Sequence, residues 1–359
     1  MNYDKNSFLA GLAAGRQMKG WAGITKSGSV TPSGGMIDAL ITGDINVAVA
    51  SNVEKMRPYA FYLCDIPSVS LPNVKAIEFG AFASCHNLAS ANVPSATKVE
   101  FDAFKNCGAL VSIDLPKITE IGNEAFYGCS ALESANMPLA TSIGTGAFRN
   151  CEALLAVDFP NVLNIDTYTF CMCRALASAN IQKAASVGGN AFNGCIALDS
   201  IQLPAVTSIG NNAFTDCTSL SAIYAPLAET VGSSTFKNCV GLTSINLPNV
   251  TELGTSAMAE CYGLTKAILP KIDDIGRTAF ENDEALEAIV LRDFNSVGLG
   301  LPLSPGTRAF YGTPMASTAT GGYFYVPRSM LETFSTGSWR AYYNAGKFRA
   351  IEDYPSILD

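Results

Sequence analysis

The stretch "NCVGLTSINLPNVTELG", residues 238–254, contains one cysteine, one proline, one glycine and regularly spaced aliphatic residues. Nearly the same phrase occurs as "NCGALVSIDLPKITEIG" at residues 106–122 and as "GCIALDSIQLPAVTSIG" at residues 194–210. Its fixed positions carry apolar and turn-forming residues rather than paired acids, bases or nucleophiles. The repetition therefore indicates a structural unit.

The phrase recurs with a period of 22 residues over most of the chain. Its phenylalanine position is occupied by Phe82, Phe104, Phe126, Phe148, Phe170, Phe192, Phe214, Phe236, Met258 and Phe280. A leucine six residues after this position keeps the same step. A fixed period in the twenties with a leucine-rich phrase predicts a stacked solenoid, because one unit alone cannot bury its apolar side.

Within one unit, "LTSINLP" predicts a short strand with Ile245 and Leu247 pointing inward and Asn246 pointing outward. Pro248 ends this strand, and Gly254 closes a turn in which we expect unusual backbone angles. The following "AF" segment predicts a helical turn. The expected fold class is thus an α/β repeat solenoid with one short parallel strand per coil. About ten to twelve coils would form a rod or arc of about 50 to 60 Å.

Three regions are expected along the chain. Residues 1–50 lack the phrase and are predicted to form a helix, starting at Asn6 or Ser7, and an N-terminal cap. Residues 51–300 hold the repeats. Residues 301–359 would form the last coil and an aromatic cap, after an insertion around "GLGLPLSPG" at 298–306. The aromatic residues assigned to this cap are Phe334, Trp339, Tyr342, Tyr343 and Phe348.

The phrase "IGxxAFxxCxxLxSIxLP", as in residues 209–226 with small departures, resembles the BspA-like leucine-rich repeat family of bacterial and some protozoan surface proteins. The tail, "YFYVP" followed by an aromatic run with Trp339, resembles the usual ending of such proteins. The resemblance covers about residues 53–354. It implies a curved right-handed solenoid, no enzymatic activity, and adhesion or binding of host or matrix proteins. Separately, residues 4–21 resemble the openings of some prophage-encoded proteins of gut bacteria.

Composition narrows the function classes. Hydrophobic residues make up 48% of the chain and the net charge is -8, which predicts an ordered protein that does not bind nucleic acid. No apolar run is long enough for a membrane span, and no signal peptide is evident in the opening residues. The single histidine, His86, argues against a catalytic triad or a multi-histidine metal centre. We therefore expect no enzyme, no metal and no cofactor.

Ten of the eleven cysteines take one equivalent position per coil. Equivalent positions project in parallel, which suits free buried thiols better than disulfides with their torsion of about 90°. Cys171 differs, because it takes a slot filled elsewhere by Lys105, Arg149, Asn193 and Lys237. This pattern predicts that Cys171 is the accessible thiol.

The candidate binding residues form a polar row on the outward side of the predicted strands, which we call the amide row. Its members are Asn92, Asp114, Asn136, Asp158, Asn180, Gln202, Tyr224 and Asn246. A flanking serine row consists of Ser90, Ser112, Ser134, Ser178, Ser200 and Ser244. Together they predict a long, flat, weakly acidic sheet face for docking a ligand, or, in the alternative interpretation, a solvated surface. One oxygen per coil falls short of a calcium site.

The leading hypothesis is a non-enzymatic protein of the bacterial cell surface or extracellular space that binds a protein or a glycan, without membrane insertion and as a monomer. The alternative is a prophage-encoded, virion- or tail-associated receptor-binding protein. In that case residues 1–50 would attach the protein to the particle.

Overall fold

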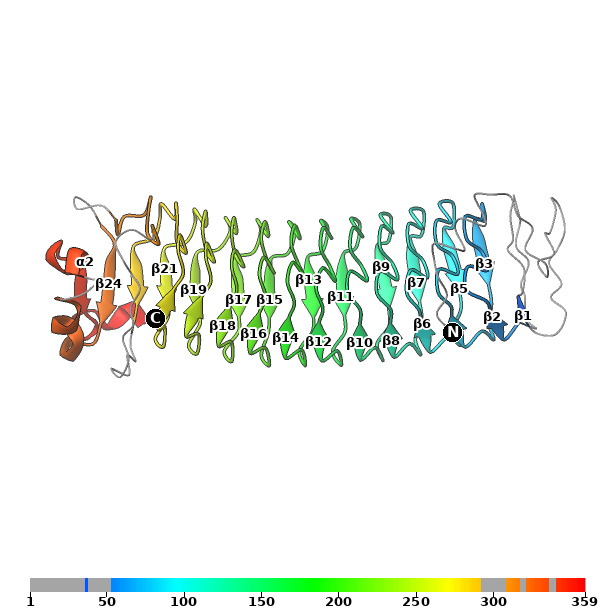
Figure 1. Cartoon of the computed structure of the whole chain (residues 1–359), viewed down its shortest axis with the longest axis horizontal. Helices are drawn as coiled ribbons and strands as arrows, with labels where there is room; N and C mark the ends of the chain where they lie inside the picture. Colours follow the sequence, from blue (N-terminus) through cyan, green and yellow to red (C-terminus); the bar gives the residue numbers. More distant parts are fainter. Residues whose placement is uncertain (1–35, 38–52, 292–307, 317–320, 336–339, 359) are drawn as a thin grey trace.

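The computed structural model describes residues 36–37, 53–291, 308–316, 321–335 and 340–358. The chain winds into an elongated β-solenoid whose coils stack along one axis (Figure 1). Neighbouring strands pair in parallel with partners 22 residues apart, such as Ser112 with Ser134 and Ser200 with Ala222. The stacked solenoid predicted from the period is confirmed.

One side of each coil is a strand of three residues. These strands are β3 (Ser68–Ser70), β5 (Ser90–Asn92), β7 (Ser112–Asp114), β9 (Ser134–Asn136), β11 (Ala156–Asp158), β13 (Ser178–Asn180), β15 (Ser200–Gln202), β17 (Ala222–Tyr224), β19 (Ser244–Asn246), β21 (Lys266–Ile268) and β23 (Ala288–Val290). The middle residue points into the core and the two flanking residues point outward, as the two-residue period of a strand requires.

A second strand of two residues lies on another side of the coil, where we expected only a turn. These strands are β2 (Lys55–Met56), β4 (Ala76–Ile77), β6 (Lys98–Val99), β8 (Glu120–Ile121), β10 (Ser142–Ile143), β12 (Asn164–Ile165), β14 (Ser186–Val187), β16 (Ser208–Ile209), β18 (Thr230–Val231), β20 (Glu252–Leu253) and β22 (Asp274–Ile275). The pair β1 (Met36–Ile37) and β2 is also parallel. Stacking brings equivalent backbone groups to pairing distance, so even two extended residues hydrogen-bond to the next coil.

The "AF" side is built from turns and not from the helical turn that we expected. Alternate amides close turns with the carbonyl three residues earlier, while the others reach the next coil. For example, the N–H groups of Phe104 and Asn106 donate to the carbonyls of Ala125 and Tyr127, both at 2.7 Å. This alternation requires left-handed backbone angles, as at Asn106 with φ 59°. The third side is therefore also held by hydrogen bonds between coils.

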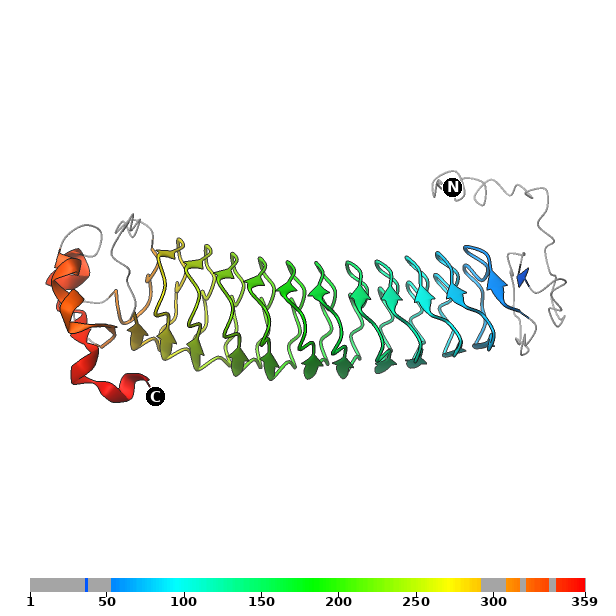
Figure 2. The same ribbon diagram turned by 90° about the horizontal axis from the view of Figure 1, so that it is seen from below.

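The rod is only slightly bent, in contrast to the curved solenoid that the resemblance implied (Figure 2). A leucine-rich repeat curves when one side of the coil is wider than the strand spacing of the other. Here all three sides carry hydrogen bonds between coils, so each side advances by about the 4.8 Å strand spacing. The outer face of the three-residue strands is consequently flat and long.

The phenylalanine ladder forms the core, as predicted. Rings in consecutive coils stack nearly parallel, with centroids 5.0 Å apart for Phe82 and Phe104 and 5.6 Å for Phe214 and Phe236. Met258 takes the same position and is fully buried. The ladder thus joins neighbouring coils into one continuous apolar column.

The recurrent glycine before the "AF" side is required for close packing, which corrects our expectation of unusual backbone angles. These residues, Gly122, Gly144, Gly188, Gly210, Gly232, Gly254 and Gly276, do not have left-handed φ values. A Cβ at Gly254 would lie 2.4 Å from the carbonyl carbon of Gly232 and from the nitrogen of Ser233. The missing side chain lets backbones of neighbouring coils approach each other.

We expect Gly254→Ala to lower the free energy of unfolding by about 1 to 3 kcal/mol, because the added methyl group overlaps backbone that cannot move alone. Urea unfolding followed by circular dichroism measures this change. Gly108→Ala is the matched control, since a Cβ there would make only an ordinary contact, 3.7 Å from the Ser130 hydroxyl. Equal losses in both variants would contradict the packing explanation.

At the C-terminal end, β24 (Tyr323–Val326) pairs with β23 and with β25 (Phe348–Ala350). The segments η2 (Arg328–Ser335) and α2 (Arg340–Asn344) lie at this end of the rod, in orange and red in Figure 1. The rings of Phe334 and Phe348 stack at 4.5 Å. Two short segments, η4 (Ile351–Asp353) and η5 (Pro355–Leu358), follow.

Several sequence predictions lie outside the described residues. They are the helix starting at Asn6 or Ser7, the insertion at residues 298–306, and Trp339. The division into a cap, repeats and a second cap stays a prediction.

Candidate functional site

The amide row lies on the outer face of the three-residue strands. Strand register places Asn136 beside Asp114, Asn180 beside Asp158, and Tyr224 beside Gln202. All eight predicted residues are exposed except Asn180, which is half-buried. The structure thus brings these residues together in one line across the coils, while their role in binding stays a prediction.

Hydrogen bonds join members of the amide row in pairs. The side-chain amide of Asn136 donates to Asp114 at 2.7 Å, and that of Asn180 donates to Asp158 at 2.6 Å. Asn92 donates to the hydroxyl of Ser70 at 3.1 Å. The alternation of asparagine and aspartate therefore orients the carboxylates without neutralising them.

The serine row takes the first position of the same strands, and its members are exposed. Ser90, Ser112 and Ser134 lie in register on β5, β7 and β9. Their short side chains leave the centre of the face without bulky groups. The face is therefore flat and hydroxyl-rich next to the amide row.

Sequence reasoning missed a third exposed line, which we call the edge row: Ala89, Val111, Glu133, Leu155, Ala177 and Asp199. Each residue precedes the first strand residue of its coil, and from Val111 onward its N–H donates to the carbonyl of the previous member. Val111 is 44% exposed and Leu155 is 55% exposed. The sequence did offer a signal for this row. Large apolar residues occur beside the polar rows, at a repeat position that has no fixed residue type.

Charge and aromatic groups divide the face into two parts. Over β7 to β15 it carries the carboxylates of Asp114, Glu133, Asp158 and Asp199. Over β17 and β19 it carries the exposed ring of Tyr224 and the amide of Asn246. The first part is acidic and partly aliphatic, and the second is uncharged.

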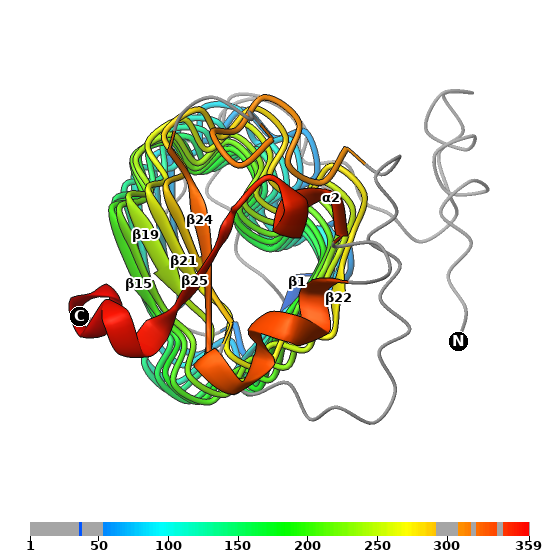
Figure 3. The ribbon, with the colours of Figure 1, turned by 90° about the vertical axis from the view of Figure 1, so that its left-hand side faces the viewer.

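The C-terminal segment covers the far end of the same face. Ile351 packs with Val290 and Tyr325, and the partly buried Ile357 and Leu358 join this cluster. Figure 3 shows the segment, in red, outside the strands β19 and β21. The outer side chains become apolar where the chain's own segment lies on them.

The single histidine and the potential metal ligands are dispersed over the described part of the chain. Among the residues that the structure describes, no three His, Cys, Asp or Glu side chains are placed to share a metal ion. His86 is exposed, with its Nδ1 3.1 Å from the Asn106 carbonyl oxygen. None of the helices in the described part of the chain combines the length and hydrophobicity that crossing a bilayer requires.

Comparison with known families identifies the repeat. The model of the BspA type leucine-rich repeat region matches residues 54–177 and 163–287, with 6 copies. The chain belongs to the BspA-type leucine-rich repeat family. The resemblance seen in the repeated phrase is therefore confirmed. Leucine-rich repeat solenoids are typically non-enzymatic, and membership of this family is consistent with a protein-binding role.

Solved leucine-rich repeat structures are similar to this chain at low identity. A leucine-rich repeat protein from Bacteroides ovatus is 22% identical, with 90% of this chain and 97% of that chain covered and a TM-score of 0.51. One from Eubacterium ventriosum is 22% identical, covers 76% and 83%, and has a TM-score of 0.47. A leucine-rich cell surface protein from Faecalibacterium prausnitzii is 23% identical, covers 70% and 79%, and has a TM-score of 0.42. No curated protein matches the chain.

The BspA-type cysteines act as buried hydrogen-bond donors. All eleven cysteines are unbridged and buried, so the predicted ladder of free thiols is confirmed. From Cys85 to Cys261, each ladder thiol donates to a phenylalanine carbonyl of the preceding coil, at 2.8 to 3.2 Å. Burial raises the pKa of Cys64 and Cys85 to about 12, which keeps both thiols protonated, as donation by Cys85 requires.

The prediction that Cys171 is the accessible thiol was wrong. The side chain is only 4% exposed. Burial raises the pKa of Cys171, while the nearby guanidinium of Arg149 opposes this shift. The Cys171 side chain is shorter than those of Arg149 and Asn193 at the equivalent positions of the neighbouring coils, which cover it. The residue types found at equivalent positions therefore did not predict its burial.

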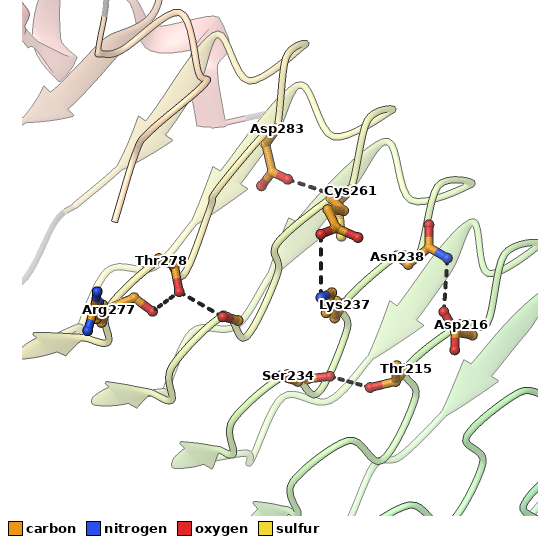
Figure 4. A network of polar contacts seen from close by, with 11 residues as sticks. Thr215, Asp216, Ser234, Lys237, Asn238, Cys261, Arg277, Thr278 and Asp283 are labelled. Atoms are coloured by element: carbon orange, nitrogen blue, oxygen red, sulfur yellow. Dashed lines mark hydrogen bonds and ion pairs between the residues drawn. The ribbon is translucent and has the colours of Figure 1, made fainter. Parts of the chain in front are cut away.

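Asp283 departs from the BspA-type phrase, because it takes the cysteine position of its coil. It is fully buried, and its Oδ1 accepts the Cys261 N–H at 2.8 Å (Figure 4). Its Oδ2 is buried with no hydrogen-bond partner. Desolvation by burial raises the pKa of Asp283 to about 8, despite the amide hydrogen bond that lowers it. Sequence reasoning missed this residue, although the interrupted cysteine series signalled it.

Proposed function

We propose that this chain is a non-enzymatic, monomeric binding protein of the bacterial cell surface that uses the outer face of its three-residue strands to bind a protein or a glycan. The observation that carries the proposal is the continuous exposed face made of the amide, serine and edge rows. Membership of the BspA-type family supports a binding role. The covered end near β23 limits the free face to the strands before it.

Rigidity supports this use of the face. The outward side chains stand on strands held on both sides by neighbouring coils, and asparagine–aspartate hydrogen bonds orient part of the amide row. A surface ordered before binding loses little conformational entropy when a partner docks. Such a face therefore favours specific recognition more than a mobile loop does.

The test uses fluorescently labelled protein on a glycan array and on immobilised host and matrix proteins. We expect Asp114→Lys with Asp158→Lys to weaken binding at least about tenfold. Each change replaces a carboxylate of the face by an ammonium group, so a partner complementary to the native face meets the opposite charge. The melting temperature should change little, since these exposed side chains contribute at most about 1 kcal/mol each.

Glu229→Lys with Glu252→Lys is the matched control, because both residues are exposed on the side of the two-residue strands. This pair makes the same change in net charge and should leave binding intact. Unaltered binding in the Asp114→Lys, Asp158→Lys variant would move the site away from the proposed face. The prophage alternative stays a prediction, since residues 4–21 lie outside the described part.

A further inference from the structure

The acidic part of the sheet face has a pattern that repeats every second coil. On β7 and β11, an apolar edge residue accompanies an aspartate of the amide row: Val111 with Asp114, and Leu155 with Asp158. On β9 between them, the edge residue is Glu133 and the amide-row residue is an asparagine. Exposed apolar side chains therefore occur on β7 and β11, two coils apart. Each of the three coils of β7, β9 and β11 carries one exposed carboxylate.

We propose that this surface binds a cationic amphipathic helix of a partner protein, lying along the solenoid axis over β7 to β15. The inference rests on the proposed function and specifies its partner class. Leucine-like side chains of the helix contact Val111 and Leu155. Lysine or arginine side chains on the flanks of the helix contact Asp114, Glu133 and Asp158.

The spacing of the apolar residues matches an α-helix better than a β-strand. Val111 and Leu155 are two coils apart, which is about 9.6 Å at strand spacing. Two turns of an α-helix advance about 10.8 Å, so a residue and the one seven positions later can contact both side chains. Same-side residues of a β-strand recur every 6.6 Å or so, which misses this spacing.

Charge favours a basic partner. Asp114, Glu133, Asp158 and Asp199 are all exposed on this part of the face, while the exposed basic residues Lys117, Arg174 and Lys183 lie before or after the strands, at its borders. The hydrogen-bond partners of Asp114 and Asp158 are side-chain amides and not cations. Complementary charge both attracts such a helix and sets its orientation.

The same face already holds a short helical segment elsewhere. At its far end, Ile351, Ile357 and Leu358 of η4 and η5 pack on outward side chains of the strands, among them Val290. The ring of Tyr354 also contacts that of Tyr325 edge-on at 5.5 Å. The outer face of this solenoid thus accepts helical turns through apolar side chains, and the proposed site continues that surface.

The experiment measures fluorescence anisotropy of a labelled leucine–lysine peptide with a helical period, titrated with the full chain at about physiological salt. A peptide of the same composition with a strand period is the second probe. We expect the helical peptide to bind at least about tenfold more tightly. The variant Asp114→Asn, Glu133→Gln, Asp158→Asn should weaken it about tenfold, and Leu155→Ser several-fold.

Two matched controls separate this site from general attraction to an acidic protein. Glu229→Gln, Glu252→Gln, Asp273→Asn removes three exposed charges on other sides of the coil. Leu227→Ser removes a leucine that is 49% exposed outside the edge row. Both should retain binding. Equal losses in the controls, or equal affinity for the two peptides, would overturn the proposal.

The outcome is distinguishable from that of the proposed function. If the Asp114→Lys, Asp158→Lys variant loses binding to an array glycan while the helical peptide does not bind, the face is a docking surface but its partner is a glycan. That result would overturn the helix proposal and leave the proposed function standing.

Discussion

Replacing Phe126 with alanine is expected to lower the free energy of unfolding by about 3 to 5 kcal/mol. The ring is fully buried between Phe104 and Phe148, with centroid distances of 5.3 and 5.1 Å. Backbone hydrogen bonds on all three sides of the coil prevent the neighbours from collapsing into the cavity. Guanidinium unfolding followed by far-ultraviolet circular dichroism measures the loss.

Phe126→Met is the matched control, because Met258 already fills the equivalent position and is fully buried. A flexible side chain of similar volume should cost about 1 kcal/mol. The cavity explanation would fail if the alanine variant were as stable as the methionine variant.

The second large effect concerns pH and Asp283. Its folded pKa of about 8 lies above the ordinary value of 3.8, so the folded protein holds a proton that the unfolded chain releases. This contribution to stability is therefore fully present below about pH 4 and decreases as the pH rises toward 8. Between about pH 4 and pH 7 the loss amounts to at most about 4 kcal/mol.

Asp283→Asn should remove this dependence, because an amide keeps an oxygen acceptor for the Cys261 N–H and does not titrate. Other groups also titrate, so the measured quantity is the difference in unfolding free energy between the parent chain and the variant at each pH. We expect this difference to grow in favour of the variant from about pH 4 to pH 8. A constant difference would show that Asp283 is not held as the neutral acid.

The repeat period was enough to predict the stack and its core. Once residues 22 apart lie in register, Phe82, Phe104 and Phe126 must share one column, and the cysteines three residues later must share another. The amide row follows in the same way, because strand alternation places Asn92 and Asp114 on the side opposite to Ile113. None of these inferences needs the shape of a coil.

The parts that sequence reasoning missed all depend on contacts between coils. The second strand, Glu252–Leu253 in one coil, exists because an equivalent segment lies beside it. Gly254 is needed because the backbone of Gly232 approaches it. Cys171 is buried because the side chains around it are longer.

The candidate face was predictable only in outline. The amide row was visible as a pattern, but its asparagine–aspartate hydrogen bonds depend on side-chain orientation. The edge row has no fixed residue type, so Val111 and Leu155 carried no repeat signal. The edge row is exposed because its residues lie at the turn that immediately precedes each three-residue strand.

By itself, the sequence determined the solenoid, its family, the phenylalanine and cysteine columns, and the line of outward polar residues. These features follow from periodicity, because identical residues at a constant spacing occupy equivalent places in every coil. Only the tertiary structure decided that three sides are hydrogen-bonded, that the rod is nearly straight, and where the C-terminal segment covers the face. Those features depend on the path of the backbone within one coil and on side chains that meet across coils, and periodicity specifies neither.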